Sequence, residues 1–160
     1  MGEYDVAQIC QNGHVITEMA NSAPELRTKH CDRCGAATTT TCSECSTPIR
    51  GYYDCGVFGG LSESKAPSFC HNCGRAYPWT ASQIEAATEL WVEESIANQE
   101  EATKFQESLE DLVKETPKAP LAASRFKKAM AKVGSETVAG IRSILTSIVS
   151  ETVKHQIWPK

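Results

Sequence analysis

Residues 31–45 read CDRCGAATTTTCSEC and hold Cys31, Cys34, Cys42 and Cys45, four cysteines in fifteen residues. Each C-x-x-C pair presents two thiolates on one tight turn, a geometry that a tetrahedral metal accepts as two of its four ligands. Only seven residues separate the two turns, which suits a short strand or link that passes from one site to the next. Each turn therefore needs a second pair of ligands from elsewhere in the chain.

Two further turns supply those ligands. Upstream stands Cys10-Gln-Asn-Gly-His14, and downstream stands Cys70-His-Asn-Cys73. Sequential pairing predicts two tandem zinc ribbons, the first over residues 4–40 and the second over residues 41–79, while an interleaved pairing stays open because the loop lengths allow both. The eight predicted metal ligands are Cys10, His14, Cys31, Cys34, Cys42, Cys45, Cys70 and Cys73.

His14 is the one imidazole in this set. The spacing C-x-x-G-H repeats the turn geometry, and Cys55 is its rival for the position; otherwise Cys55 is an ordinary free thiol. His30 and His71 stand beside ligands and are expected to face solvent or to support the ligands. The expected cofactors are two structural Zn²⁺ ions, and the soft donors also permit iron in a rubredoxin-like site.

The first 79 residues contain few apolar side chains. The candidates for a core are Val6, Ile9, Val15, Ile16, Leu26, Ile49, Val57, Phe58 and Phe69. These are too few to fold about 80 residues unaided, whereas one structural zinc contributes on the order of 10 to 16 kcal/mol of apparent binding energy. Residues 17–30 are expected to form a loop, Pro48–Tyr53 and Val57–Phe58 short strands, and Gly59–Gly60 and Ser62–Pro67 an exposed loop.

The pattern changes at Thr80, where apolar residues begin to recur every three or four positions. The sequence predicts a helical domain of about four helices over residues 80–160. Thr80 and Gln83 form a capping-box pattern for a helix over 81–97, and Asn98 and Glu101 form another for a helix that ends before Pro117. A third helix has Pro120 in its first turn and ends at Gly134. The apolar stripes, including that of the fourth helix, are Ile84, Ala87, Leu90 and Trp91; Ala102, Phe105, Leu109 and Leu112; Leu121, Phe126, Met130 and Val133; and Val138, Ile141, Leu145 and Ile148. The predicted fold is thus a small metal-bound β domain followed by an all-α bundle, α+β overall.

Charge and hydropathy exclude several classes of protein. The net charge is −4, and no apolar run approaches the roughly 18 to 20 residues that a membrane span needs. Residues 81–116 carry two basic and ten acidic side chains, whereas residues 117–160 carry eight and two. The acidity disfavours a general polyanion binder. The start lacks a secretory signal, so we expect a cytoplasmic protein, in which C-x-x-C turns bind metal rather than form disulfides.

Together the segments YDVAQICQNGH, HCDRCG, TCSECSTPIRGYY, FCHNCGRAYPWT and SETVKHQIWP resemble a family of uncharacterised bacterial proteins, a domain of unknown function with zinc-ribbon character. The resemblance covers almost the whole chain. It implies two metal-bound ribbons and a helical C-terminal part, with the eight ligands already named, and it implies no activity.

Three functions are open to such a chain. The first is a non-enzymatic zinc-binding adaptor or scaffold that binds another protein; the wide apolar face of the C-terminal helix also suits self-association. The second is a nucleic-acid binder, with a basic and aromatic surface of Arg50, Tyr52, Tyr53, Phe58, Arg75, Tyr77 and Trp79 and a basic helix face of Arg125, Lys127, Lys128 and Lys132. The third is an enzyme with an open metal position or a reactive thiol such as Cys55. We expect no enzyme, because four protein ligands leave no metal position for water and no catalytic motif is present.

Overall fold

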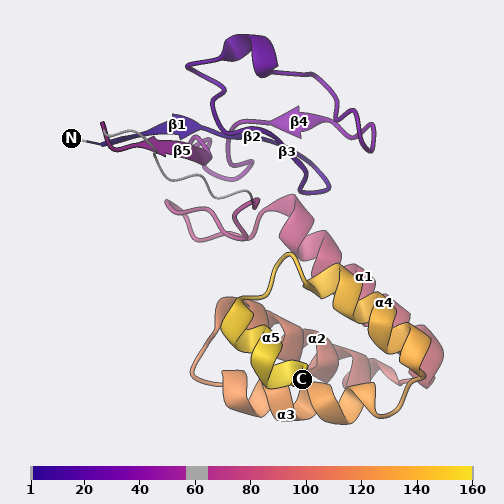
Figure 1. The fold of residues 1–160 in the computed structure, drawn as a ribbon. Coiled ribbons are helices and arrows are strands. Elements are labelled where there is room, and N and C mark those ends of the chain that lie inside the picture. The colour runs from indigo at the N-terminus through magenta and orange to yellow at the C-terminus, as the bar shows by residue number, and fades with distance from the viewer. Residues whose placement is uncertain (1, 57–64, 160) are drawn as a thin grey trace. The chain divides into compact units, whose positions relative to one another are not determined.

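The computed structural model describes residues 2–56 and 65–159. The strand predicted at Val57–Phe58, the loop predicted at Gly59–Gly60 and the first three residues of the loop predicted at Ser62–Pro67 lie outside the described residues. The chain divides into two compact units, Met1–Ala81 and Ser82–Lys160. Strands and loops form the first unit and helices the second, and the first four residues of helix α1 belong to the first unit (Figure 1).

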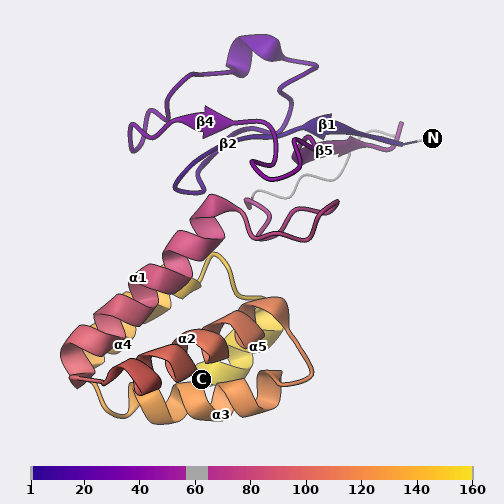
Figure 2. The ribbon, with the colours of Figure 1, turned by 180° about the vertical axis from the view of Figure 1, so that it is seen from behind.

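Two small antiparallel sheets form the first unit. Strand β1 (Glu3–Val6) pairs with β5 (Arg50–Asp54), and Tyr4 lies opposite Tyr53. In the second sheet β2 (Gln8–Cys10) lies between β3 (Val15–Thr17) and β4 (Thr38–Thr39). Figure 2 shows β2 and β4 of this sheet from behind. The predicted loop after β3 contains one 3₁₀ turn, η1 (Pro24–Leu26). The strand predicted from Pro48 begins at Arg50.

One apolar cluster connects the two predicted ribbons. It contains Ile9 and Ile49, both fully buried, with Tyr77 and Trp79 each 2% exposed. The two aromatic rings stack with centroids 4.6 Å apart, and the Trp79 indole N–H donates to the Pro67 carbonyl over 2.8 Å. The placement of Tyr77 and Trp79 on a nucleic-acid-binding surface was therefore wrong. A unit with so few aliphatic residues uses these aromatic rings as its core.

Leu26 is also placed differently from the prediction. Its side chain is 49% exposed at the end of η1, because the loop around it is held by polar contacts rather than by apolar packing. The buried Gln8 side chain, for example, donates to the Thr28 carbonyl and accepts from the Thr28 amide.

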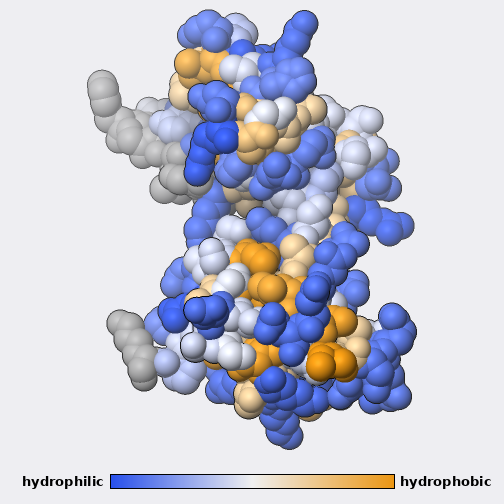
Figure 3. All heavy atoms as spheres, turned by 90° about the vertical axis from the view of Figure 1, so that its right-hand side faces the viewer, coloured by the Kyte–Doolittle hydropathy of each residue, from blue (hydrophilic) through white to orange (hydrophobic). Residues whose placement is uncertain are grey.

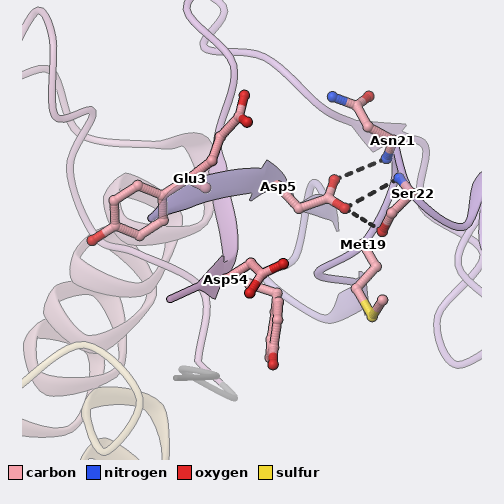
Figure 4. Close-up of a pocket in the computed structure, with 8 residues that line it drawn as sticks. Glu3, Asp5, Met19, Asn21, Ser22 and Asp54 are labelled. Carbon is pink, nitrogen blue, oxygen red and sulfur yellow. Dashed lines mark hydrogen bonds between the residues drawn. The ribbon is translucent and has the colours of Figure 1, made fainter. Parts of the chain in front are cut away.

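Asp5 fixes the loop that follows β3. Its carboxylate accepts from the backbone amides of Asn21 and Ser22, at 2.9 and 3.1 Å, and from the Ser22 hydroxyl (Figure 4). Partial burial acts to raise the pKa of this carboxyl, but the hydrogen bonds from Ser22, Asn21 and Val6 outweigh it and hold the pKa below the ordinary 3.8. The ionised side chain thus acts like a cap on two backbone amides that find no other acceptor in the part of the chain that the structure describes.

We expect Asp5→Ala to lower the free energy of unfolding by about 1 to 2 kcal/mol, since it removes both carboxylate oxygens that accept from the Asn21 and Ser22 amides. Asp5→Asn keeps one carbonyl oxygen and is expected to lose less. Urea unfolding of the metal-loaded variants at neutral pH measures both values. Equal losses in the two variants, or none in either, would contradict this role for Asp5.

The helical unit contains five helices within the described residues, not about four. These are α1 (Pro78–Ser95), α2 (Gln99–Lys114), α3 (Ala119–Met130), α4 (Ser135–Leu145) and α5 (Glu151–Ile157). The predicted fourth helix is two helices. At the break, the Ser150 hydroxyl accepts from the Val153 amide and so caps α5, while it donates to Glu115 at the end of α2.

The two predicted capping boxes differ in outcome. Asn98 and Glu101 form theirs, with reciprocal hydrogen bonds of 2.9 and 3.1 Å. Thr80 does not cap a helix, because α1 already begins at Pro78 and the Thr80 hydroxyl donates to the Ser68 carbonyl instead. The start of α1 is thereby attached to the second ribbon, within the first unit.

The apolar stripes form the core of the helical unit. Phe105, Leu109, Phe126, Ile141 and Leu145 are each at most 4% exposed. Leu121, which was assigned to a stripe, is instead 50% exposed. On the face shown in Figure 3, hydrophobic patches on this unit are separated by hydrophilic residues. Among the described residues, no helix has both the length and the apolar character needed to cross a membrane.

Candidate metal centres

The first centre brings together Cys10, His14, Cys31 and Cys34. Cys10 ends β2 and His14 stands just before β3, so the hairpin between these strands carries both side chains. Gly13 permits the tight turn with a φ of 86°, and the Cys10 amide donates to the His14 carbonyl. His14 Nδ1 lies 3.5 Å from Cys10 Sγ and 3.6 Å from Cys31 Sγ. Cys10 Sγ lies 3.7 Å from Cys34 Sγ.

The second centre brings together Cys42, Cys45, Cys70 and Cys73. Cys42 Sγ lies 3.8 Å from Cys73 Sγ, and Cys45 Sγ lies 3.7 Å from Cys70 Sγ. In each centre all four donor atoms lie within 4.8 Å of one another. The pairing is sequential, so the interleaved alternative is not the arrangement of this structure.

The spacing of the donor atoms fits a tetrahedral ion. With metal–sulfur bonds of about 2.3 Å, two tetrahedral sulfurs stand about 3.8 Å apart, and a nitrogen at about 2.0 to 2.1 Å stands about 3.5 Å from each sulfur. The observed distances match these values. They are far longer than the 2.05 Å or so of a disulfide. Both groups could therefore hold a metal ion.

The turns donate hydrogen bonds to the sulfurs. The Ala36 amide and the Asn12 side chain lower the pKa of the Cys34 thiol to about 6. The Thr47 hydroxyl, 3.2 Å from Cys45 Sγ, and the Thr47 amide do the same for Cys45, whose pKa is also about 6. These donors favour thiolates, the form that binds metal.

Crowding among the sulfurs acts in the opposite direction. The Arg75 amide acts to lower the pKa of Cys73, but burial and the sulfurs of Cys45, Cys70 and Cys42 outweigh it and raise the pKa to about 11. Four sulfurs this close cannot all become thiolates without a compensating charge. A bound cation would supply that charge, so the second centre could hold one.

Two asparagines beside the ligands were not predicted. The Asn12 amide donates to Cys34 Sγ over 3.4 Å, and the Asn72 amide lies 3.7 Å from Cys45 Sγ. Each asparagine follows a ligand cysteine by two residues, and each bonds the second cysteine of the opposite turn. The repeated Cys-x-Asn in two of the four turns was the sequence signal that could have identified them.

Among the described residues, Cys55, His30 and His71 belong to neither centre. Cys55 is exposed and takes no part in the first centre, where His14 occupies the position for which Cys55 was a rival. Cys55 is thus a free thiol in this structure.

Ser46 is the exception among the turns. Gly35 and Gly74 follow the second cysteine of their turns with φ of 72° and 73°, and their amides donate to Cys31 and Cys70. Ser46 makes the same bond to the Cys42 carbonyl at a φ of 60°. A side chain in this left-handed conformation is strained, and only glycine adopts it freely.

Ser46→Gly is accordingly expected to raise the free energy of unfolding by about 0.5 to 1 kcal/mol, because relief of strain exceeds the added entropy of the unfolded chain. Thermal unfolding of the metal-loaded protein measures the gain. Ser43→Gly is the matched control, since Ser43 lies in the same turn without a positive φ and should gain nothing. A larger gain at Ser43 than at Ser46 would refute the assignment of strain.

Comparison with models of protein families identifies a family for this chain. The model of a family described as "Uncharacterized protein conserved in bacteria (DUF2321)" matches residues 3–157. No curated protein and no solved structure matches the chain.

Proposed function

Since the chain belongs to the DUF2321 family of uncharacterised bacterial proteins, whose description names no activity, we propose from its own residues that it is a zinc-binding adaptor. It would bind two structural Zn²⁺ ions and act by binding another protein. The observation that carries the proposal is the completeness of both centres, each with four protein donors at tetrahedral spacing.

Zinc is the metal that suits the donors best. The first centre offers three sulfurs and one imidazole nitrogen, a set typical of structural zinc. The second offers four sulfurs, which suit zinc or a rubredoxin-like iron equally. If both centres bind the same metal, that metal is therefore zinc.

Complete coordination also supports a non-enzymatic role. A catalytic zinc keeps one position open for the water or substrate that it activates, whereas four protein ligands occupy a tetrahedral ion fully. Zinc in these centres would instead stabilise the first unit, whose apolar cluster is small. The binding free energy of each zinc ion, on the order of 10 kcal/mol, would exceed the stability that such a small apolar cluster contributes.

Affinity capture with the zinc-loaded chain in a bacterial extract tests the adaptor. We expect a protein partner in stoichiometric amount, lost when the chain is stripped of metal by a chelator. Repeated recovery of the bare chain, or turnover of a substrate dependent on either metal, would contradict the proposal.

One pocket favours nucleic acid as a second candidate partner. A cavity of about 330 Å³ in the first unit is lined by Tyr4, Arg50, Tyr53, Phe69 and His71, among others. The Arg50 guanidinium lies 4.7 Å from the centre of the Tyr4 ring. Tyrosines and an arginine can stack bases and pair with phosphate. Absence of oligonucleotide binding even at low salt would eliminate this candidate.

A further inference from the structure

A groove in the helical unit combines an apolar floor with a basic rim. It has a volume of about 200 Å³, and its floor includes Trp91 of α1, Phe105 of α2 and Ala129 of α3. A space of this size accommodates one large apolar side chain. All residues that line it belong to the second unit.

The floor is held rigidly. The Trp91 indole N–H donates to the Ala129 carbonyl over 2.9 Å, which fixes α1 against α3. The Trp91 and Phe105 rings stack with centroids 4.5 Å apart, and Phe105 stacks on Phe126 at 6.0 Å. These contacts fix the shape of the groove before any ligand arrives, which reduces the entropy that binding must overcome.

The rim is strongly basic. Four cations line the groove, Lys104, Arg125, Lys128 and Lys132, against a single carboxylate, Glu101. Lys132 Nζ pairs with Glu101 over 3.0 Å and lies 5.9 Å from the centre of the Trp91 ring.

The rim cations make few strong ion pairs that an acidic ligand would have to break. Arg125 and Lys128 are exposed and have no ion-pair partner within residues 2–56 and 65–159. The pair of Lys104 with Glu100 is exposed, so its carboxylate can be exchanged for that of a ligand at small cost. The groove therefore has unused positive charge at its edge.

We propose that this groove binds an acidic peptide segment of the protein partner, with one large apolar side chain on the Trp91–Phe105 floor and flanking carboxylates on the rim cations. The proposal rests on the adaptor function and names the chemistry of its partner. Charge complementarity decides the occupant, because a rim of four cations repels a basic segment and gains no ion pairs from a neutral one. A fixed slot for one apolar side chain favours a peptide over nucleic acid, which would present a row of phosphates.

Fluorescence anisotropy with labelled synthetic peptides tests this on the full, zinc-loaded chain. The probes are glutamate-rich peptides with one central leucine, phenylalanine or tryptophan, and matched peptides with a central alanine or with lysines in place of the glutamates. We expect an anchored acidic peptide to bind at least about tenfold more tightly than its alanine and lysine counterparts. A rise in salt from about 0.01 M to about 0.15 M should weaken it.

Charge reversal locates the binding. Arg125→Glu with Lys128→Glu should weaken binding at least about tenfold. The control is Lys118→Glu with Lys127→Glu, which changes the net charge by the same amount. Lys118 lies at the start of α3 and Lys127 within it, and neither lines the groove, so this variant should have little effect on binding. If the first variant fails to fold, binding is located instead by the NMR resonance of the Trp91 indole N–H in the unaltered chain. A peptide anchored on the floor must shift that resonance.

Each remaining outcome contradicts the proposal. These outcomes are no preference for an anchor residue, equal losses in the two double variants, an unshifted Trp91 resonance, or tighter binding of a single-stranded RNA at the groove. If the peptides do not bind the groove, but the chain binds two zinc ions and captures a partner through another surface, the adaptor function is retained and only the groove proposal fails. If the peptides bind a chain that takes up no zinc in either centre, the zinc sites of the adaptor are contradicted and the groove proposal is retained.

Discussion

Cys42→Ser is expected to release one of the two metal ions and to unfold the second centre. Cys42 is 3% exposed within the apolar cluster, and its sulfur is one of four donors. A serine hydroxyl is a poor zinc ligand, so the ion would keep only three donors. The loss, on the order of 10 kcal/mol, equals the entire stability of many small domains.

Native mass spectrometry and circular dichroism measure the two effects. The variant should carry one ion in place of two and should lose ordered structure in the first unit. Cys55→Ser is the control, because Cys55 is exposed and belongs to neither centre. If Cys42→Ser retains two ions, or if Cys55→Ser loses one, the assignment of the ligands is wrong.

Gly51→Ala should also disrupt the first unit, although Gly51 binds no metal. A Cβ at this position in β5 would lie 2.2 Å from the Glu18 carbonyl oxygen and 2.8 Å from the Ala7 amide nitrogen. Both neighbours are backbone atoms held by hydrogen bonds, from Tyr52 to Glu18 and from Ala7 to Ile49. Neither can move without breaking its hydrogen bond, so we expect a loss of about 3 to 5 kcal/mol.

Urea unfolding of the zinc-loaded variants measures this loss. Gly35→Ala provides a graded comparison, because Gly35 has a φ of 72° but open space around it, and should lose only about 1 kcal/mol. Equal effects at the two glycines would show that the close approach of β5 to Glu18 and Ala7 is not present in solution.

The arrangement of the donors could be predicted from the sequence because metal-binding turns are local. The spacing of Cys31, Cys34, Cys42 and Cys45 predicted two centres, and the structure groups them with the expected upstream and downstream turns. The resemblance to an uncharacterised bacterial family with two ribbons and a helical C-terminal part is likewise confirmed. Local geometry carries this information without knowledge of the rest of the fold.

Features that depend on distant contacts were missed. The pairing of β1 with β5 joins residues about 50 positions apart, and neither strand has a pattern that specifies its partner. Tyr77 and Trp79 look like surface aromatics in sequence, and only the stacked pair beneath the second centre shows them as core. The apolar period continues through Ile148 and Val149, so the break at Ser150 depends on its contact with Glu115.

X-ray absorption at the zinc edge of the purified, zinc-loaded protein tests the central claim most directly. Seven sulfurs and one nitrogen shared by two closed centres predict an average of about 3.5 sulfurs at about 2.3 Å and about 0.5 nitrogen per ion, with no bound solvent. An oxygen in the first coordination shell, or clearly fewer sulfurs per ion, would contradict two closed structural sites and the adaptor function built on them.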